Sequence, residues 1–160
     1  MLFRSEEIRN KLIEFKDSCD KPVYAYGDVY DQKALYLSTV ADQVVVHPLG
    51  SVDFRGLSSH LLFFTRALEK IGIDMQVVRH GKFKAAVEPF MLEEMSEENR
   101  EQTMVYMNSL WTHMLEGISE KRDISVDQLN DLADNVQTLK TGEEVVETGL
   151  VDAAKYKDQV

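Results

Sequence analysis

The sequence has one cysteine, no long apolar run and few positive charges, and each shortage excludes a class of protein. Cys19 has no second cysteine to pair with, which excludes an intrachain disulfide and a zinc site built on paired cysteines. The longest apolar runs, at 44–46 and 61–64, are far shorter than the about 18 residues that span a bilayer. The 28 acidic residues outnumber the 18 basic ones, so the net charge of -10 argues against a nucleic-acid surface and gives no sign of binding to anionic lipid.

Motifs for cofactors, metals and a serine nucleophile are missing as well. No P-loop and no glycine-rich dinucleotide fingerprint occurs, so we expect no cofactor. We expect no metal either, because no metal-ligand spacing joins the four histidines, which are His47, His60, His80 and His113. There is no Gly-x-Ser-x-Gly elbow, and the serines lie mostly at predicted caps and turns, where the hydroxyl bonds to the backbone.

Short apolar strands alternate with helices along a chain that has no Pro-, Gly- or Ser-rich linker. The 160 residues therefore predict one domain. We expect strands at 22–26, 44–47 and 75–79, with the second broken by the His-Pro-Leu-Gly sequence at 47–50. Helices are predicted to begin at Ser5, Gln32, Ser58, Ser96, Ser125 and Thr141, and five of them to end near Phe15, Val40, Ile71, Lys121 and Gly149. This alternation predicts an α/β protein whose parallel strands are covered on both faces.

Apolar stripes are expected on the first of these helices (Ile8, Leu12, Ile13 and Phe15) and on the third (Leu61, Leu62, Phe64 and Leu68), and capping boxes at Ser125 with Gln128 and at Thr141 with Glu144. The stretch 79–90 is expected to be irregular.

The segment 79–90 differs from the rest because it places two lysines, Lys82 and Lys84, among small and aromatic residues. A lysine acts as a general base only if its pKa falls from about 10.4 towards about 7, which disfavours the charged form by about 4 kcal/mol. Burial against the apolar neighbours would lower a lysine pKa in this way. Two solvated lysines are the commoner arrangement, so the residue types alone do not decide.

The same segment resembles the lysine segment of the signal peptide peptidase A family, peptidase family S49. Residues 81–90 read Gly-Lys-Phe-Lys-Ala-Ala-Val-Glu-Pro-Phe, and the family pattern is Gly-x-Tyr/Phe-Lys-Ser/Ala-Ala-Val-Glu-Pro-Phe. Further agreements follow in order at 21–25, 41–44, 48–50, 141–144 and 149–152. The resemblance implies a crotonase/ClpP-like α/β superfold and assigns the general-base lysine of the family to Lys84 rather than Lys82.

The position of the nucleophile is where this sequence departs from single-domain members of the family. Those members carry Gly-Asp-x-Ala-Ala-Ser-Gly-Gly-Tyr-Tyr, whereas residues 27–36 here read Gly-Asp-Val-Tyr-Asp-Gln-Lys-Ala-Leu-Tyr. Gln32 stands in the serine position and cannot attack a carbonyl. Long-form members divide the dyad, because their N-terminal domain supplies the lysine and their C-terminal domain the serine. The resemblance therefore implies a lysine-bearing part that is inactive alone, in which replacing Gln32 by alanine leaves activity largely intact.

The resemblance also sets expectations for the whole protein. Residues 1–5 match the family poorly and are interpreted as a non-native remnant, and residues 6–160 as a partial N-terminal, lysine-bearing peptidase domain. The superfold is then truncated at its N-terminus, and the serine-bearing C-terminal domain is absent. The expected protein is a serine endopeptidase of the Ser-Lys dyad type that degrades cleaved signal peptides. Its expected partners are peptide substrates, its own C-terminal domain and further copies of itself in a tetramer. We expect it to be anchored in the bacterial inner (cytoplasmic) membrane, with its catalytic domain on the periplasmic side.

Two other functions stay open. A catalytically inactive crotonase-like scaffold domain fits Gln32 equally well, although Lys84 in its intact Val-Glu-Pro-Phe setting favours the protease. An acyl-CoA enzyme of the same superfold would bind a thioester through oxyanion amides, and nothing here resembles its active-site loops. Glu88 is predicted to be structural, because a carboxylate close to Lys84 would raise the pKa of that lysine and oppose its task as a base.

Overall fold

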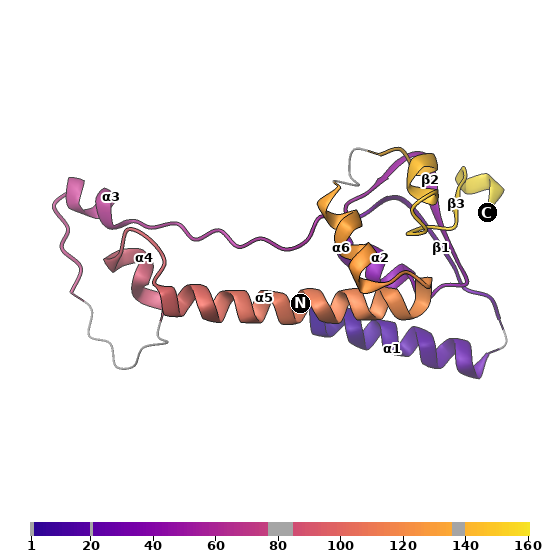
Figure 1. Cartoon of the computed structure of the whole chain (residues 1–160), viewed down its shortest axis with the longest axis horizontal. Coiled ribbons are helices and arrows are strands. Elements are labelled where there is room, and N and C mark those ends of the chain that lie inside the picture. The colour runs from indigo at the N-terminus through magenta and orange to yellow at the C-terminus, as the bar shows by residue number, and fades with distance from the viewer. Residues whose placement is uncertain (1, 20, 77–84, 136–139) are drawn as a thin grey trace. The chain divides into compact units, whose positions relative to one another are not determined.

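A computed structural model describes residues 2–19, 21–76, 85–135 and 140–160 (Figure 1). Two compact units make up the chain: the first combines 1–56 with 111–160, and the second is 57–110. The sequence predicts one domain because it has no linker. The boundary between the units at 110/111 falls within one continuous helix, α5 (Glu97–Arg122), so no linker marks it.

A small parallel sheet lies at the centre of the first unit. Its strands are in the order β1-β2-β3, with β1 at Tyr24–Tyr30, β2 at Gln43–Val52 and β3 at Ala153–Ala154. Both pairs of neighbouring strands are parallel. Because β2 is the middle strand, it has a partner strand on each edge. The mixture of helices with a parallel sheet agrees with the predicted α/β class.

The second strand is longer than predicted, because the His-Pro-Leu-Gly sequence forms a bulge instead of ending it. The β1–β2 ladder breaks after Val46 and resumes at Ser51, so one residue of β1, Asp28, faces 47–50 of β2. A bulge tolerates the proline, which has no N–H to donate to a ladder. Gly50 is required at this close approach, since a Cβ there would lie 2.2 Å from the backbone oxygen of Asp28.

The third strand comes from a different part of the chain than predicted. Residues 75–76 form no strand, and residues 77–79 lie outside the described residues. The strand that pairs with β2 is β3, two alanines between charged residues, which is too short and too weakly apolar to show in the sequence. Tertiary hydrogen bonds hold it: Asp152 N–H donates to the Val44 carbonyl (2.8 Å) and Lys155 N–H to the Val46 carbonyl (2.9 Å).

The helices agree best with the sequence where capping signals mark their starts. They are α1 (Leu2–Ser18), α2 (Gln32–Ser38), α3 (Thr65–Lys70), α4 (Glu88–Met91), α5, α6 (Val126–Asp134) and α7 (Gly142–Val146), with 3₁₀ turns at Ala85–Val87 and Lys157–Gln159. Ser125 and Thr141 form the two predicted capping boxes with Gln128 and Glu144. The Ser96 hydroxyl accepts from the N–H of the third residue of α5, as its predicted cap position requires.

Predictions that rest on apolar spacing alone are less accurate. The helix expected from Ser58 to Ile71 is limited to α3, and none of its residues is buried. Leu62, counted in the predicted stripe, is 72% exposed. An apolar stripe stabilises a short helix only when it packs against something, so this stripe does not extend α3 towards its N-terminus.

The core of the first unit gathers on one face of β2. Val44 and Val46 point to the same face, as alternation along a strand requires. They belong to one cluster with buried residues of α2, α5, α6 and α7, namely Leu35, Tyr36, Met114, Leu115, Ile118, Leu129, Ala133 and Val145. The ring of Trp111 packs 5.4 Å from that of Phe54 at its margin.

A buried arginine attaches α1 to this core, and the predicted apolar stripe is buried only in part, with Leu12 and Ile13 half-buried. Ile8 and Phe15 were expected on the packed face but are 53% and 44% exposed, whereas Arg9 is buried. Its Nη1 donates to the Tyr36 carbonyl (2.7 Å), and its Nη2 to the Gly117 carbonyl (2.6 Å). The guanidinium also lies over the Tyr36 ring, 4.6 Å from its centroid. Burial lowers the pKa of Arg9.

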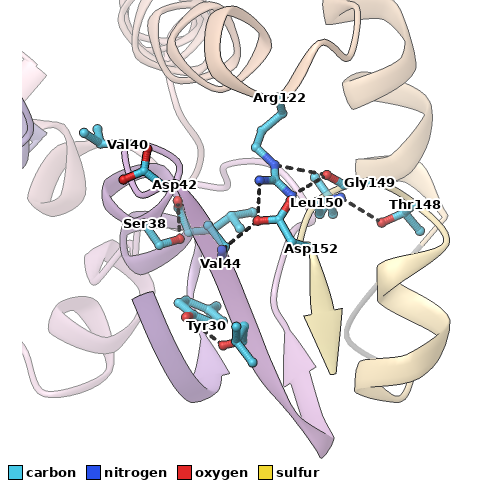
Figure 2. A network of polar contacts seen from close by, with 12 residues as sticks. Tyr30, Ser38, Val40, Asp42, Val44, Arg122, Thr148, Gly149, Leu150 and Asp152 are labelled. Carbon is cyan, nitrogen blue, oxygen red and sulfur yellow. Dashed lines mark hydrogen bonds and ion pairs between the residues drawn. The ribbon is translucent and has the colours of Figure 1, made fainter. Parts of the chain in front are cut away.

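A second polar network fixes β3 and the end of α5 (Figure 2). The Asp152 carboxylate accepts from the Val44 N–H (2.6 Å) and pairs with Arg122 Nη1 (2.9 Å). Arg122 also donates from Nε (3.1 Å) and Nη2 (2.9 Å) to the Gly149 carbonyl. Asp152 therefore bonds both to the central strand, at Val44, and to the last turn of α5, at Arg122.

Replacing the buried arginine tests whether α1 depends on it. Arg9→Met keeps a long side chain but leaves the Tyr36 and Gly117 carbonyls without this donor, so the free energy of unfolding should fall by about 2–4 kcal/mol. Urea unfolding followed by the fluorescence of Trp111, the single tryptophan, measures this change. Arg4→Met, at an exposed position of α1, is the matched control. Equal stability of the two variants would contradict the assigned role of Arg9.

Tyr30 predicts how stability changes at alkaline pH. Its buried hydroxyl donates to the Val45 carbonyl (3.0 Å), and burial, with a smaller effect of Tyr26, raises the pKa of Tyr30 to about 12. The pKa of an unfolded tyrosine is about 10, so this stabilisation is complete below pH 10 and is lost as the pH rises towards 12. The free energy of unfolding should fall over that interval and fall less steeply in Tyr30→Phe. Identical slopes in the two proteins would contradict this assignment.

Candidate active site

The predicted general base, Lys84, and its neighbour Lys82 lie outside the described residues. The described chain resumes at Ala85 and is helical, not irregular as expected: the 3₁₀ turn Ala85–Val87 leads directly into α4. Pro89 lies in the first turn of α4, where its missing N–H has no helical partner to lose. The part of the lysine segment after Lys84 is thus a 3₁₀ turn and a short helix.

Glu88, the first residue of α4, joins that helix to the start of α5. Its buried carboxylate accepts from the Ser96 hydroxyl (2.6 Å), the Asn99 side-chain amide (2.8 Å) and the Ser96 N–H (3.3 Å). A carboxylate at this place also faces the positive end of the α5 dipole. These contacts give Glu88 a structural task.

Further contacts hold α3 against α4. Phe64 N–H donates to the Pro89 carbonyl (2.7 Å), and the rings of Phe64 and Phe90 stack with centroids 5.9 Å apart. An open pocket of about 220 Å³ lies between these helices, and Met75 and Phe90 both line it. Met75, before the undescribed residues 77–84, and Phe90, after them, therefore line the same pocket.

Gln32 occupies the first position of α2, two residues after the end of β1. Asp31 is the N-cap, and its carboxylate accepts from the Ala34 N–H (2.7 Å). The carboxyl end of a parallel strand, followed by a helix start, is where open α/β sheets place functional groups. The side chain here is already engaged: Gln32 Oε1 accepts from the N–H groups of Arg55 and Gly56 (both 2.8 Å), and Nε2 donates to the Gly56 carbonyl (3.0 Å).

The two positions named by the sequence fall in different parts of the chain. Gln32 belongs to the first unit, and the described residues that flank Lys84 belong to the second. The sequence shows that Gln32 stands in the position of the nucleophile. It does not predict that Gln32 contacts Arg55 and Gly56. No motif signals such a contact, because it joins a side chain to backbone groups more than 20 positions away.

The part of the chain that the structure describes has neither a cluster of metal-binding side chains nor a membrane-spanning helix. There, no three His, Cys, Asp or Glu side chains come together to hold a metal ion. No described helix is both long enough and apolar enough to cross a membrane.

Comparison with known sequences decides the family. Residues 15–160 match the family model described as Peptidase family S49. The chain belongs to peptidase family S49. The resemblance seen in the sequence is thereby confirmed, and the family relationship covers both units.

Curated relatives of this S49 chain carry protease names. It is 36% identical to Protease 4 of Haemophilus influenzae and 38% identical to Protease 4 of Salmonella typhi, each over 122 residues that make up 76% of this chain and 20% of the relative. It is 30% identical over 159 residues to "Serine protease SPPA, chloroplastic" of Arabidopsis thaliana, which is 97% of this chain and 22% of that protein. The chain spans about a fifth of the length of these relatives.

Replacing Glu88 tests whether its carboxylate holds the start of α5. Glu88→Ala leaves the Ser96 hydroxyl and the Asn99 amide without this acceptor, which should cost about 1–3 kcal/mol of local stability. Hydrogen exchange of the amides in the first turns of α5 should therefore become faster. Glu94→Ala, which removes an exposed carboxylate nearby, should leave exchange unchanged. Unchanged exchange in Glu88→Ala would show that Glu88 does not hold the start of α5.

Proposed function

We propose that this chain supplies the general-base lysine of a serine endopeptidase that works through a Ser-Lys dyad. Lys84 is the base, and the serine nucleophile belongs to a C-terminal domain beyond these 160 residues. The fold of the complete protein is of the crotonase/ClpP type, and its substrates are cleaved signal peptides. Membership of peptidase family S49 is the observation that carries this proposal.

The geometry of Gln32 supports the division of the dyad. Gln32 stands at the helix start that corresponds to the serine position, and its side chain makes three hydrogen bonds to backbone groups of Arg55 and Gly56. A carboxamide is not a nucleophile towards a peptide carbonyl. The serine of the proposed dyad must then come from another part of the protein.

The proposed mechanism uses Lys84 twice. Its neutral amine takes the proton of the serine hydroxyl as the oxygen attacks the peptide carbonyl, and the ammonium then returns a proton to the leaving amine. Water hydrolyses the acyl-enzyme in the second half of the reaction. The base needs to lie within about 3 Å of the hydroxyl and to be neutral at the working pH.

The contacts of Glu88 support its predicted structural role. Its carboxylate is engaged with Ser96 and Asn99 at the start of α5. Glu88 thus has a task that does not require it to take part in proton transfer. This leaves Lys84 as the one residue of the segment to which we assign chemistry.

We further propose that the whole protein is a homo-tetramer anchored in the bacterial inner membrane, with its catalytic domain on the periplasmic side. Exposed apolar side chains in the second unit support assembly with other protein surfaces. Among the described residues, every buried apolar side chain belongs to the first unit. The second unit exposes Leu62, Phe64, Ile71, Met104, Val105 and Tyr106. Such surface is commonly covered in an assembly.

A catalytically inactive scaffold is the second candidate, because the engaged amide of Gln32 fits it equally well. Substitutions of the two lysines in the full-length protein distinguish the candidates. Lys84→Ala should abolish hydrolysis of a signal peptide, whereas Lys82→Ala should cost little, since only the base takes part in proton transfer. Lys84→Arg should also be inactive, because a guanidinium stays protonated and cannot accept the proton.

Peptide cleavage followed by mass spectrometry measures each of these rates, and circular dichroism checks that each variant is folded. The 160-residue chain alone should cleave nothing. A fully active Lys84→Ala protein, or cleavage by the isolated chain, would refute the divided dyad. A full-length protein that cleaves no peptide before any substitution would favour the scaffold.

A further inference from the structure

Methionine is concentrated in the second unit. Of the seven methionines, Met1 begins the sequence and Met114 is buried in the core of the first unit. The others all belong to the second unit, and each lines one of two open pockets. We call them the methionine surface, and they are Met75, Met91, Met95, Met104 and Met107.

The larger pocket follows one face of α5. Its lining includes Arg100, Thr103, Met104 and Met107, whose spacing of i, i+3, i+4 and i+7 places them side by side on the helix. At a rise of about 1.5 Å per residue, this face is about 10 Å long. Residues 57–59, which form neither helix nor strand, line the same pocket, whose volume is about 270 Å³.

The smaller pocket, of about 220 Å³, lies at α3 and α4. Met91 lines it and Met95 lines the larger one, so both pockets adjoin the short segment between α4 and α5. Small-molecule sites in proteins typically measure about 300–1,000 Å³. Two open pockets below that size, on consecutive parts of the chain, suit neighbouring side chains of a bound peptide better than one compact ligand.

The methionine side chains are too exposed to serve as filling of a core. Met104, Met75 and Met91 are 54%, 42% and 37% exposed. A methionine side chain is unbranched and polarizable, so it adapts to apolar groups of different shapes, and flexible methionine-rich surfaces are typical of proteins that accept many partners. The methionine surface therefore suits an apolar occupant whose exact sequence varies.

Charged residues at the two pockets indicate the direction of this occupant. Arg100 lines the larger pocket, whereas Glu69 and Asp74 line the smaller one. A segment that matches both is apolar in its middle, basic at one end and negatively charged at the other. A cleaved signal peptide has these properties, because a basic region precedes its apolar run of about 7–15 residues and cleavage leaves a carboxylate at its C-terminus.

We propose that the methionine surface binds the apolar run of a cleaved signal peptide and tolerates different apolar sequences there. The basic region of the peptide lies at Glu69 and Asp74, and its C-terminal carboxylate pairs with Arg100. The identity of the peptide rests on the proposed function. The binding itself depends only on described residues of the second unit.

Peptide binding is measured in the full-length protein that carries Lys84→Ala, which under the proposed function does not cleave the probe. The labelled probe has a lysine pair, an apolar run of about ten residues and a free C-terminal carboxylate, with leucine, valine or phenylalanine alternating with alanine. Fluorescence anisotropy should give Kd values for the three probes that agree within about threefold. Met104→Ser combined with Met107→Ser should raise each Kd by about tenfold or more, because it removes apolar contact area.

Two further variants separate the methionine surface from a general loss of apolar area. Val105→Ser removes a side chain of α5 that is 65% exposed and lines neither pocket, so each Kd should stay within about twofold. Met104→Ile combined with Met107→Ile keeps apolar area but introduces branched, stiffer side chains. The Kd values of the three probes should then differ by about tenfold, since the surface no longer adapts equally to each of them. Circular dichroism checks that each variant is folded.

Amidation of the probe tests the direction of binding. It removes the charge at the C-terminus of the peptide, so it should raise Kd by about two- to fivefold in the protein that has Arg100. In Arg100→Gln the free and the amidated probes should bind equally, because the pair that distinguishes them is gone. An equal effect of amidation with and without Arg100 would overturn the assigned direction.

Other outcomes would overturn the methionine surface or the proposed function. Unchanged Kd values in the serine double variant, or an equal loss in Val105→Ser, would overturn the methionine surface. A serine double variant that changes the oligomeric state while Kd is unchanged would also overturn it, since the surface would then be a contact between copies. A protein with Lys84 intact that binds the probes but cleaves none of them would instead overturn the proposed protease and leave the methionine surface supported.

Discussion

The buried backbone of β2 has to find hydrogen-bond partners on both of its edges, and the first unit is organised around this requirement. Buried N–H and C=O groups that lack partners cost free energy comparable to a lost hydrogen bond. β1 serves one edge and the segment around β3 the other, where Asp152 engages both the carbonyl and the N–H of Val44. Asp152 lies 108 positions after Val44, so the hydrogen bonds of the central strand are completed by a segment that is distant in the sequence.

Side-chain cations extend this arrangement from the sheet to the helices. Arg122 joins the last turn of α5 to Asp152 and to the Gly149 carbonyl, and Arg9 joins α1 to the Tyr36 and Gly117 carbonyls. In both cases an arginine donates to backbone carbonyls of other elements and so joins segments that are far apart in the sequence. The apolar cluster supplies the main driving force for burial, and these fixed donors specify which helices meet.

Local signals in the sequence predicted local structure well, and long-range contacts are what they missed. The capping boxes at Ser125 and Thr141 depend on residues three positions apart and formed as expected. The bulge in β2 depends on its register against β1, so the sequence showed a break where the strand continues. β3 has only the pairing with β2 to define it.

In the lysine segment, too, the sequence identified the family but did not predict the contacts between residues. Its sequence identified the family because ten consecutive positions carry specific residue types. The match to the family model then confirmed this identification. The role of Glu88 at the start of α5 needed the structure, since Ser96 and Asn99 become its partners only when α4 folds back on α5. Lys84 itself stays a prediction, as it lies outside the described residues.

At position 32 the residue type decides what the side chain can do. At a helix start after a parallel strand, a short hydroxyl side chain suits a nucleophile, since it holds the reactive oxygen close to the backbone. A hydroxyl also has a single oxygen and a short reach, so it is poorly suited to hold two N–H groups and a carbonyl of another segment together. A carboxamide carries its acceptor and its donor on separate atoms at the end of a longer chain. The residue type that removes the nucleophile from this position is thus also one that can bond to the backbone of both Arg55 and Gly56.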